Sequence, residues 1–413
     1  MPQSFDVIVL GAGMVGVSVA VHLQQRGRAV ALLDRKPAGS ETSMGNAGLI
    51  QREGVFPYAF PRDLGTLLRY ATNTAPELRY HLLDLPALAP FLFRYWRNSA
   101  PARHRRIAGH YATLIEHCVA EHRDLAAQAG ALHLLRPAGW MRVYRSQRRL
   151  HAALQEAADW QRDFGVACEA FDAHALRRAQ PALVGPLAGA VRYLDAVPCT
   201  DPQGLVQAYA GLFERLGGTV LQGDAATLRE GWSVESAQGT LSAREVVVAL
   251  GPWALPATRR LGLRLPLAVK RGYHMHYAAG DGPELSEPVL DAEVGYLLAP
   301  MRRGIRLTTG AELARLDAPP TPVQLGQVEP RARELLALGA RLDEQPWMGQ
   351  RPCTPDMLPL LGPAPGQRGL WLAHGHAHHG FTLGPVSGRL LAEMICGQPT
   401  LLDPTPFAPA RFA

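Results

Sequence analysis

The hydrophobic pattern at the start of the chain predicts a strand, a helix and a second strand. Residues 5–10 form a short apolar run that contains one aspartate, residues 14–25 form an apolar run of helical length, and residues 30–34 form another short run that ends on a carboxylate. A short apolar run bounded by glycine is typical of a buried strand. This order predicts a βαβ unit of the kind that opens many α/β proteins.

Three glycines separate the first strand from the helix, in the spacing Gly11-x-Gly13-x-x-Gly16. The first lets the turn close, the second lets the backbone approach a pyrophosphate, and the third lets helix and strand pack tightly. The helix that starts at Met14 presents free N–H groups and a positive dipole end to phosphates. Asp34 ends the second strand, where a carboxylate can bond both ribose hydroxyls. Together these features predict a dinucleotide site.

The same segment has a second interpretation, because residues 7–25 carry no formal charge. Such a run resembles a signal peptide or a membrane span. However, no basic residue precedes it, Asp6 stands at its edge, and no cleavage site of small residues follows. We therefore expect a cytoplasmic protein.

The rest of the chain mixes helices with short strands. Periodicity predicts helices over 101–130, 146–164, 202–216 and 384–396, and strands over 140–144, 190–193, 217–221, 244–250, 273–277, 295–299, 305–309 and 370–373. The three strands between 273 and 309 form an expected antiparallel set. The fold class is therefore α/β with an inserted α+β part. We expect a discontinuous, Rossmann-like cofactor domain over 1–87, 199–262 and 346–413, and an antiparallel-sheet substrate domain over 88–198 and 263–345.

Residues 82–96 are strongly apolar but contain Pro86 and Pro90. This segment is too short and too broken to span a bilayer. Two interpretations stay open for it, packing in the core or at a domain interface, and docking on a membrane surface.

Composition indicates a large globular protein. Of the 413 residues 47% are hydrophobic and 19% are charged, enough for a large core and two domains. The net charge is +6, but the densest basic run, residues 103–106, is short and has no aromatic neighbours. A solvated helix start explains it, with contact to anionic lipid or a redox partner as the alternative; nucleic acid is not an expected partner. The five scattered cysteines include no Cys-x-x-Cys pair, so we expect reduced thiols.

Four stretches give the chain a family resemblance: the N-terminal glycine turn and residues 41–50, 349–359 and 375–382. In this order and near these spacings they resemble the FAD-dependent D-amino-acid oxidoreductase superfamily, which also holds glycine oxidase and sarcosine oxidase. The chain looks most similar to bacterial D-amino-acid dehydrogenase small subunits and D-hydroxyproline dehydrogenases. The resemblance covers essentially the whole chain, and it implies FAD as the cofactor.

The small and hydroxyl residues of 42–48 suit a loop whose backbone lies against a flat ring and a pyrophosphate, although such runs are also plain turns. The helix after 375–382 can direct N–H groups at the flavin pyrimidine edge, where its dipole stabilises the anionic reduced ring. Those superfamily members that tether FAD through a histidine resemble this chain at the loop near Gly45 and Asn46, but no histidine is present there, so we expect noncovalent FAD. The expected FAD-binding residues are Gly11, Ala12, Gly13, Met14, Val15, Gly16, Asp34, Arg35, Thr42, Ser43, Gly45, Asn46, Ala47, Gly48, Leu49, Ala225, Ala226, Ala249, Gly251, His379, Gly380, Phe381 and Thr382.

Four histidines stand close together, His374, His376, His378 and His379. No cysteine or carboxylate pattern with metal-ligand spacing surrounds them. We therefore interpret the segment as a loop facing the flavin and expect no metal.

The substrate residues follow from the resemblance and from charge. Arg351 matches the carboxylate-binding arginine of glycine oxidase, and its planar fork suits a carboxylate; a surface salt bridge is the alternative. Tyr296 resembles the tyrosine that shares this carboxylate, with a core position as the alternative. Side chains alternate along 273–277, and we expect Tyr273 and His274 to line the cavity.

The implied reaction is oxidation of a D-amino or D-imino acid, of the D-proline, D-hydroxyproline or D-alanine type, to the imine. Hydride passes from Cα to flavin N5, the imine is then hydrolysed or rearranges, and electrons leave to a quinone or a redox protein. Two alternatives stay open: an oxygen-using oxidase of the glycine or sarcosine type, and a flavoprotein subunit of a multi-subunit redox complex. For a dehydrogenase that passes electrons to a quinone or a redox protein, we expect contact with the inner membrane from the cytoplasmic side.

Overall fold

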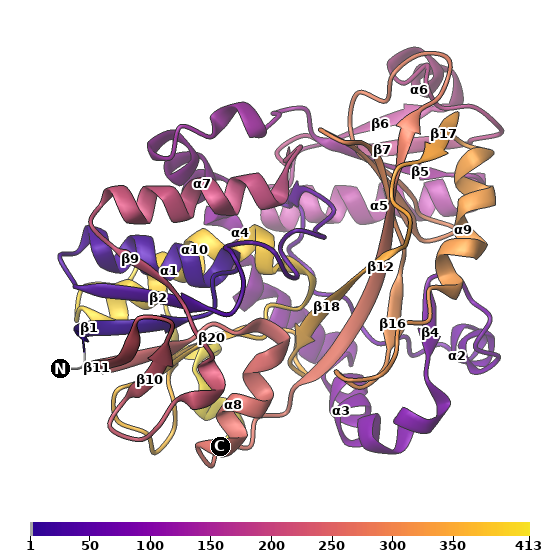
Figure 1. The fold of residues 1–413 in the computed structure, drawn as a ribbon. Helices are drawn as coiled ribbons and strands as arrows, with labels where there is room; N and C mark the ends of the chain where they lie inside the picture. The colour runs from indigo at the N-terminus through magenta and orange to yellow at the C-terminus, as the bar shows by residue number, and fades with distance from the viewer. Residues whose placement is uncertain (1–2) are drawn as a thin grey trace.

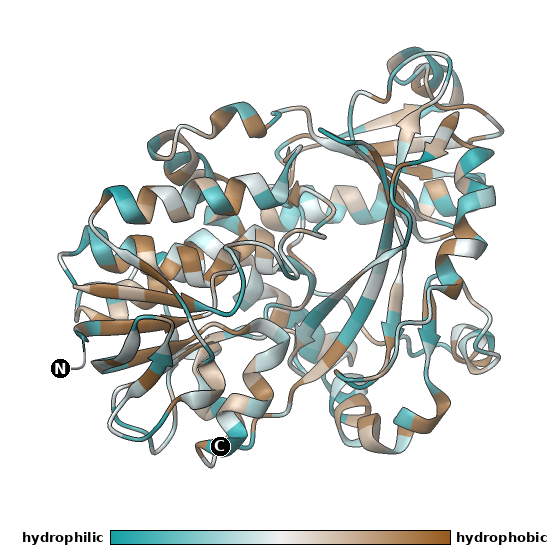
Figure 2. Ribbon diagram, in the orientation of Figure 1, coloured by the Kyte–Doolittle hydropathy of each residue, from teal (hydrophilic) through white to brown (hydrophobic). Residues whose placement is uncertain are grey.

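Two β-sheets organise residues 3–413, the part of the chain that the computed structural model describes (Figure 1). The first has the strand order β19-β20-β11-β1-β2-β9, with β10 paired to β11. Its strands are β1 (Gln3–Leu10), β2 (Val30–Asp34), β9 (Thr219–Gln222), β10 (Ser233–Ser236), β11 (Gly239–Val248), β19 (Leu360–Pro363) and β20 (Leu370–His374). Neighbours from β20 to β9 run parallel. These strands are largely brown in Figure 2, because both faces of a parallel sheet are buried.

Helices α1 (Met14–Gln25), α4 (Pro101–Gln128), α7 (Pro202–Arg215) and α10 (Gly380–Ile395) lie on one face of this sheet (Figure 1). α10 packs against both α1 and α4. The close approach of α10 to α1 depends on glycine, because a Cβ at Gly388 would lie 2.6 Å from the backbone carbon of Ser18. α10 is buried over most of its length, as expected for a helix that is apolar on nearly every side.

The second sheet is largely antiparallel and has eleven strands, in the order β4-β16-β12-β15-β14-β13-β5-β7-β6, with β17 and β18 also paired to β12. The strands are β4 (Leu78–Tyr80), β5 (Trp140–Tyr144), β6 (Cys168–Asp172), β7 (Gly189–Tyr193), β12 (Ala268–Ala279), β13 (Val289–Asp291), β14 (Tyr296–Met301), β15 (Gly304–Thr308), β16 (Ala311–Leu313), β17 (Leu338–Arg341) and β18 (Trp347–Cys353). One face packs on α9 (Val323–Arg333) and α6 (Ala173–Ala179). β12 stands between α9 and the first sheet (Figure 1).

The remaining elements connect these layers. They are α2 (Leu64–Ala71), α3 (Leu85–Asn98), α5 (Gln147–Phe164), α8 (Ala254–Arg260) and a small sheet of β3 (Leu49–Ile50) and β8 (Val197–Pro198). Within residues 3–413 no helix is both long and apolar enough to cross a bilayer. The five cysteines are free thiols.

The predicted fold class is confirmed, and the predicted helix over 14–25 and strand over 140–144 have the observed bounds. Three segments lie elsewhere than the predicted domain boundaries would place them. β4 and β18 belong to the second sheet, although 1–87 and 346–413 were assigned to the cofactor domain. α4 packs on α10 and α7, although it falls within 88–198. Long-range pairing and packing, which periodicity does not reveal, decide these positions.

Candidate active site

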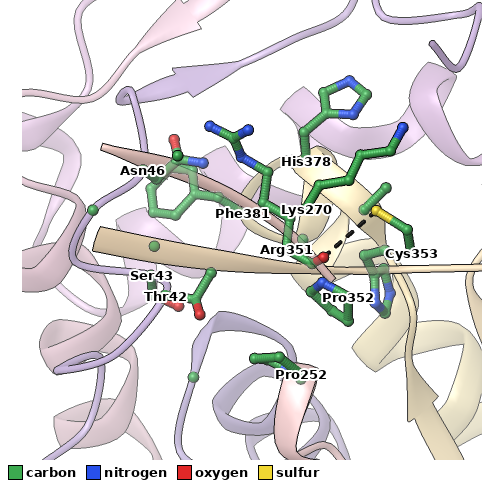
Figure 3. A pocket seen from close by; sticks show the side chains of 18 of the residues that line it. Thr42, Ser43, Asn46, Pro252, Lys270, Arg351, Pro352, Cys353, His378 and Phe381 are labelled. Carbon is green, nitrogen blue, oxygen red and sulfur yellow. Dashed lines mark hydrogen bonds between the residues drawn. The ribbon is translucent and has the colours of Figure 1, made fainter. Parts of the chain in front are cut away.

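A cavity of about 810 Å³ runs between the two sheets. At one end it is lined by the glycine turn after β1 and by the end of β2, and at the other by residues of β5, β12 and β18. Figure 3 shows part of this lining, with Ser43 and Asn46 on one side and Arg351, Lys270 and His378 on another. We call the end at the glycine turn and β2 the nucleotide end, and the end at β5, β12 and β18 the substrate end.

The glycine turn has the geometry that a pyrophosphate site needs. Gly11 has a φ of 106°, and a Cβ on it would lie 2.5 Å from the carbonyl oxygen of Ala249. A Cβ on Gly16 would lie 1.8 Å from the carbonyl oxygen of Gly11, so this glycine serves the contact between turn and helix. α1 begins at Met14 with no acidic residue in its first turn. Its N-terminus therefore offers an undisturbed positive dipole end.

Asp34 lines the cavity where β2 ends. Its Oδ2 accepts a hydrogen bond from the Ala12 N–H (2.7 Å) and its Oδ1 accepts one from the Lys36 N–H (3.0 Å). A carboxylate has about four acceptor positions, so two remain for ribose hydroxyls. Beside it, the Arg35 guanidinium lies 4.7 Å from the ring centroid of Trp253, at the same end of the cavity.

The loop after β2 is fixed against β18 and α1. The Ser43 hydroxyl accepts a hydrogen bond from the Met14 N–H (3.0 Å), and the Thr42 hydroxyl donates one to the Gln350 carbonyl (3.0 Å). A Cβ on Gly45 would lie 1.7 Å from the indole ring of Trp347. The loop backbone therefore lies flat between the nucleotide end and β18, as a flavin-contacting loop requires.

The start of α10 closes another side of the cavity, which Ala377, His378, Gly380 and Phe381 line. Ala377 has a φ of 50°, a conformation that a non-glycine residue rarely adopts. Next to it, both ring nitrogens of His374 are buried without a hydrogen-bond partner, and burial lowers its pKa to about 3. Unsatisfied polar atoms and a helix N-terminus on the cavity wall fit a polar ring system.

Most of the residues predicted to bind FAD line this cavity, and four do not. Gly16 and Gly48 act through packing, since a Cβ on Gly48 would lie 2.3 Å from the Cys199 carbonyl oxygen. His379 is a correction: its ring is held by the Tyr111 hydroxyl (2.7 Å) and Gln51 (3.2 Å), away from the cavity. Thr382 is a second correction. Its hydroxyl donates to the Leu49 carbonyl (3.1 Å), so it holds the end of the 42–49 loop and does not line the cavity.

At the substrate end, Arg351 extends from β18 with no carboxylate oxygen within 4.0 Å in the described part of the chain. Within residues 3–413 its guanidinium makes one hydrogen bond, to the Gly310 carbonyl, which is long at 3.4 Å. Burial lowers the pKa of its guanidinium. Lys270 is its direct partner on the neighbouring strand, and the two side chains extend to the same side in Figure 3. The alternative of a surface salt bridge therefore does not hold for Arg351.

His378 completes this group. Its ring centroid lies 4.4 Å from that of Tyr58, and its pKa is held well below the usual range by burial and then by the charges of His379, Arg351 and Lys270. It is therefore neutral at physiological pH. In residues 3–413, no group of three or more His, Cys, Asp or Glu side chains is arranged to hold a metal ion.

One predicted substrate residue, Tyr296, is corrected by the structure, whereas Tyr273 and His274 both line the cavity. Tyr296 faces α9, and its hydroxyl donates to the Arg331 carbonyl (3.1 Å) within an apolar core. Tyr273 borders the cavity, but its hydroxyl turns away to Glu312 Oε2 (2.8 Å). His274 is on the cavity side, where its ring stacks on Trp347 (4.8 Å) and burial lowers its pKa to about 2.

Sequence reasoning missed several lining residues, namely Tyr58, Arg142, Lys270 and Trp347. For Arg142 a signal was present. It is the one charged residue in the otherwise apolar run Trp140–Tyr144, and the strand places it on the same face as Trp140. A lone arginine on a largely buried strand indicates a partner on that face.

Comparison with known proteins identifies the class. The family described as "FAD dependent oxidoreductase" matches residues 6–394, so the chain belongs to this family. FAD is its cofactor, and the residues of the nucleotide end fit it.

Individual relatives extend along the whole chain. The D-amino acid dehydrogenase of Cereibacter sphaeroides is 33% identical over 414 residues, covering 95% of this chain and 92% of its own length. The D-amino-acid oxidase of Bradyrhizobium diazoefficiens is 28% identical and covers all of both chains. The structure of glycine oxidase from Geobacillus kaustophilus superposes with a TM-score of 0.74 at 23% identity over the full length of both chains, which shows the shared fold.

Proposed function

We propose that this protein is a dehydrogenase that oxidises D-amino or D-imino acids at Cα, with noncovalently bound FAD. The observation that carries the proposal is Arg351, a partly buried guanidinium that lines the cavity and has no carboxylate partner among residues 3–413. The full-length relatives named D-amino acid dehydrogenase support the same substrate class.

The residues at the substrate end bind the amino acid and orient its Cα–H bond. Arg351 holds the substrate carboxylate through two charge-assisted hydrogen bonds, which fixes the direction of the Cα–H bond. The positive charges of Arg351 and Lys270, which lower the pKa of His378, also disfavour an ammonium group beside them. The substrate amine is therefore held in its neutral form, from which hydride loss is possible.

When bound at the nucleotide end, FAD would supply a two-electron acceptor for the substrate, and the amino acid, having lost a hydride from Cα and a proton from nitrogen, would leave as an imine that water hydrolyses. D-Proline, D-hydroxyproline and D-alanine are the substrates that the proposal names.

The proposed electron acceptor is a quinone or a redox protein at a membrane surface. The surface of residues 58–96 supports this part. Leu83 is 94% exposed and Phe93 is 60% exposed, and further exposed apolar side chains on this surface are Tyr58, Leu64, Leu68, Leu82 and Trp96. The Arg62 guanidinium lies 4.1 Å from the Trp96 ring centroid, so positive charge accompanies the apolar groups. The opposite side of α3 is buried through Leu88, Phe91 and Tyr95. Exposed apolar residues next to basic ones are typical of docking on anionic lipid.

Anaerobic titration of the purified yellow protein tests the proposal. We expect D-proline or D-alanine to bleach the flavin absorbance and the L-enantiomers to leave it unchanged. Failure of every D-amino acid in a broad panel to bleach the flavin contradicts the proposal. Hydrogen peroxide formed in air in proportion to turnover indicates the oxidase alternative, and dye reduction only with added subunits indicates the multi-subunit alternative.

Two separate measurements test the remaining parts. Acid precipitation releases FAD into the supernatant if the flavin is noncovalent, whereas flavin retained in the pellet contradicts this. Flotation with vesicles containing anionic lipid tests the membrane surface. We expect the protein to float with them and a Leu83→Glu, Phe93→Glu variant to remain below, while equal recovery of both proteins contradicts docking through residues 82–96.

A further inference from the structure

The substrate end carries more positive charge than one amino-acid carboxylate neutralises. Arg142 of β5, Lys270 of β12 and Arg351 of β18 all line it. β12 and β18 are neighbours in the second sheet and β5 lies farther along it, and all three strands contribute side chains to the cavity lining. An unpaired charge in a partly buried site is costly, so a ligand of opposite charge is expected there.

The three cations have few protein partners. Lys270 Nζ donates to the Tyr95 hydroxyl (2.9 Å) and lies 4.0 Å from that ring. Arg142 has one carboxylate oxygen within 4.0 Å in the described chain, Oε2 of Glu156 at 3.9 Å, on a side chain that is half exposed. The buried Nε of Arg142 has no hydrogen-bond partner. Arg142 is nevertheless well positioned, because its guanidinium packs against the rings of Trp140, Trp160 and Tyr193.

The acidic side chains that line the cavity lie at the nucleotide end or already have a basic partner. Asp34, Glu41 and Asp224 line the nucleotide end, and Glu77 is paired with Arg69. Glu53 is buried near Arg142 but does not line the cavity, and burial raises the pKa of its carboxyl group.

Glu53 is also already engaged, since its Oε1 accepts hydrogen bonds from the Trp140 indole N–H (2.8 Å) and from Gln51 (2.8 Å). It does not supply the missing negative charge at the substrate end.

Arg142 and Arg351 line the same end of the cavity, although they come from different strands. Tyr58, which lines the same end of the cavity, is within electrostatic reach of both guanidinium groups. The Tyr58 ring also contacts the His378 ring. The charges of Arg351 and Lys270 contribute to the lowered pKa of His378, so both cations lie near it. A ligand that reaches Arg351 with one end can therefore extend past Tyr58 toward Arg142.

We propose that Arg142 binds a second carboxylate of the substrate, so that the enzyme oxidises dicarboxylic D-amino or D-imino acids more efficiently than monocarboxylic ones such as D-proline and D-alanine. The inference rests on the proposed function, in which Arg351 binds the α-carboxylate. A dicarboxylic substrate with a neutral amine brings two negative charges to the three cations, whereas a monocarboxylic one leaves Arg142 with the distant, half-exposed Glu156 carboxylate at 3.9 Å. Specificity then arises because an uncharged side chain gives the buried Nε of Arg142 no charged acceptor.

Acid and amide pairs of equal size test the inference. Anaerobic flavin reduction is measured with D-glutamate against D-glutamine and with D-aspartate against D-asparagine. We expect the reduction rate constant divided by Kd to favour the acids by about thirtyfold or more, the usual effect of leaving one buried charge unpaired. In Arg142→Gln this ratio falls to within about threefold, because the selective contact is lost. Arg149→Gln, an exposed arginine on the neighbouring α5, retains the wild-type ratio.

The outcomes separate this inference from the proposed function. Equal reduction by acid and amide in the wild-type protein overturns the inference and leaves the D-amino-acid proposal intact. An undiminished ratio in Arg142→Gln overturns the role of Arg142. If Arg142→Gln does not fold, flavin spectral changes on binding glutarate and butyrate to the wild-type protein decide the question, and equal affinity overturns the inference. No reduction by any D-amino acid removes the proposed function and the inference together.

Discussion

The two ends of the cavity recognise their ligands in different ways. The nucleotide end is built from backbone: a glycine turn, a helix N-terminus and one carboxylate, nearly all within residues 11–49. The substrate end is built from side chains of β5, β12 and β18, which come from distant parts of the sequence between Trp140 and Cys353. The first is therefore a local arrangement that tolerates little backbone change, and the second is a charge arrangement that can be altered one side chain at a time. The following variants test this difference.

The largest effect is expected at Arg351. Arg351→Ala removes one partner of a desolvated charge pair, which costs about 2–5 kcal/mol, so kcat/KM for D-proline or D-alanine should fall by roughly thirty- to several-thousandfold. Arg351→Lys should recover only part of this, because a point charge cannot reproduce the planar fork. Steady-state kinetics measure the loss, and flavin content per protein serves as the control, since it should remain near the wild-type value. A kcat/KM within a fewfold of wild type would show that the carboxylate binds elsewhere.

A backbone change at the nucleotide end should act on FAD and on stability together. Gly11→Ala places a Cβ against the Ala249 carbonyl and requires a φ of 106°, so we expect roughly 1–3 kcal/mol of strain and reduced flavin content. Gly109→Ala in α4, where a Cβ meets no atom within 4 Å, is the matched control and should retain both. Thermal unfolding and the flavin-to-protein absorbance ratio measure the effect. Equal flavin content in the two variants contradicts the claim that FAD binding needs a glycine at position 11.

Asp34→Ala should weaken FAD binding while substrate discrimination persists in the flavin-loaded fraction. One charge-assisted hydrogen bond is worth about 1.5–3 kcal/mol, or roughly ten- to a hundredfold in Kd. Titration of the apoprotein with FAD measures this, with Asp34→Asn as the variant of equal size. Unchanged affinity in Asp34→Ala would exclude Asp34 from the ribose site.

The smallest effect is expected at Tyr296, which lies on the α9 face of the second sheet. Tyr296→Phe removes the hydrogen bond to the Arg331 carbonyl and should lower the free energy of unfolding by about 0.5–1.5 kcal/mol. kcat/KM should stay within about twofold of wild type, because a hydroxyl outside the cavity makes no substrate contact. A selective loss of activity toward free amino acids would restore Tyr296 to the site.

The difference between the two ends also explains what sequence reasoning achieved. The helix over 14–25 and the carboxylate at Asp34 were predictable, because glycine spacing and hydrophobic period report local backbone geometry. Arg351 was found through its motif. Tyr296 was assigned from the family resemblance, and the alternative of a core position holds, because the pairing of β14 with β13 and β15 directs its side chain toward α9. Arg142 reaches the site through long-range pairing, because β5 joins the same eleven-stranded sheet as β12 and β18.

The central claim is that a guanidinium at the substrate end recognises the carboxylate of an amino acid. Anaerobic flavin reduction by D-alanine and by D-alaninamide, in wild type and in Arg351→Ala, tests it most directly, since the two compounds differ in the carboxylate alone. We predict that wild type prefers D-alanine by roughly thirtyfold or more and that the preference largely disappears in Arg351→Ala. Equal reduction by both compounds in wild type, or an undiminished preference in the variant, would contradict the claim.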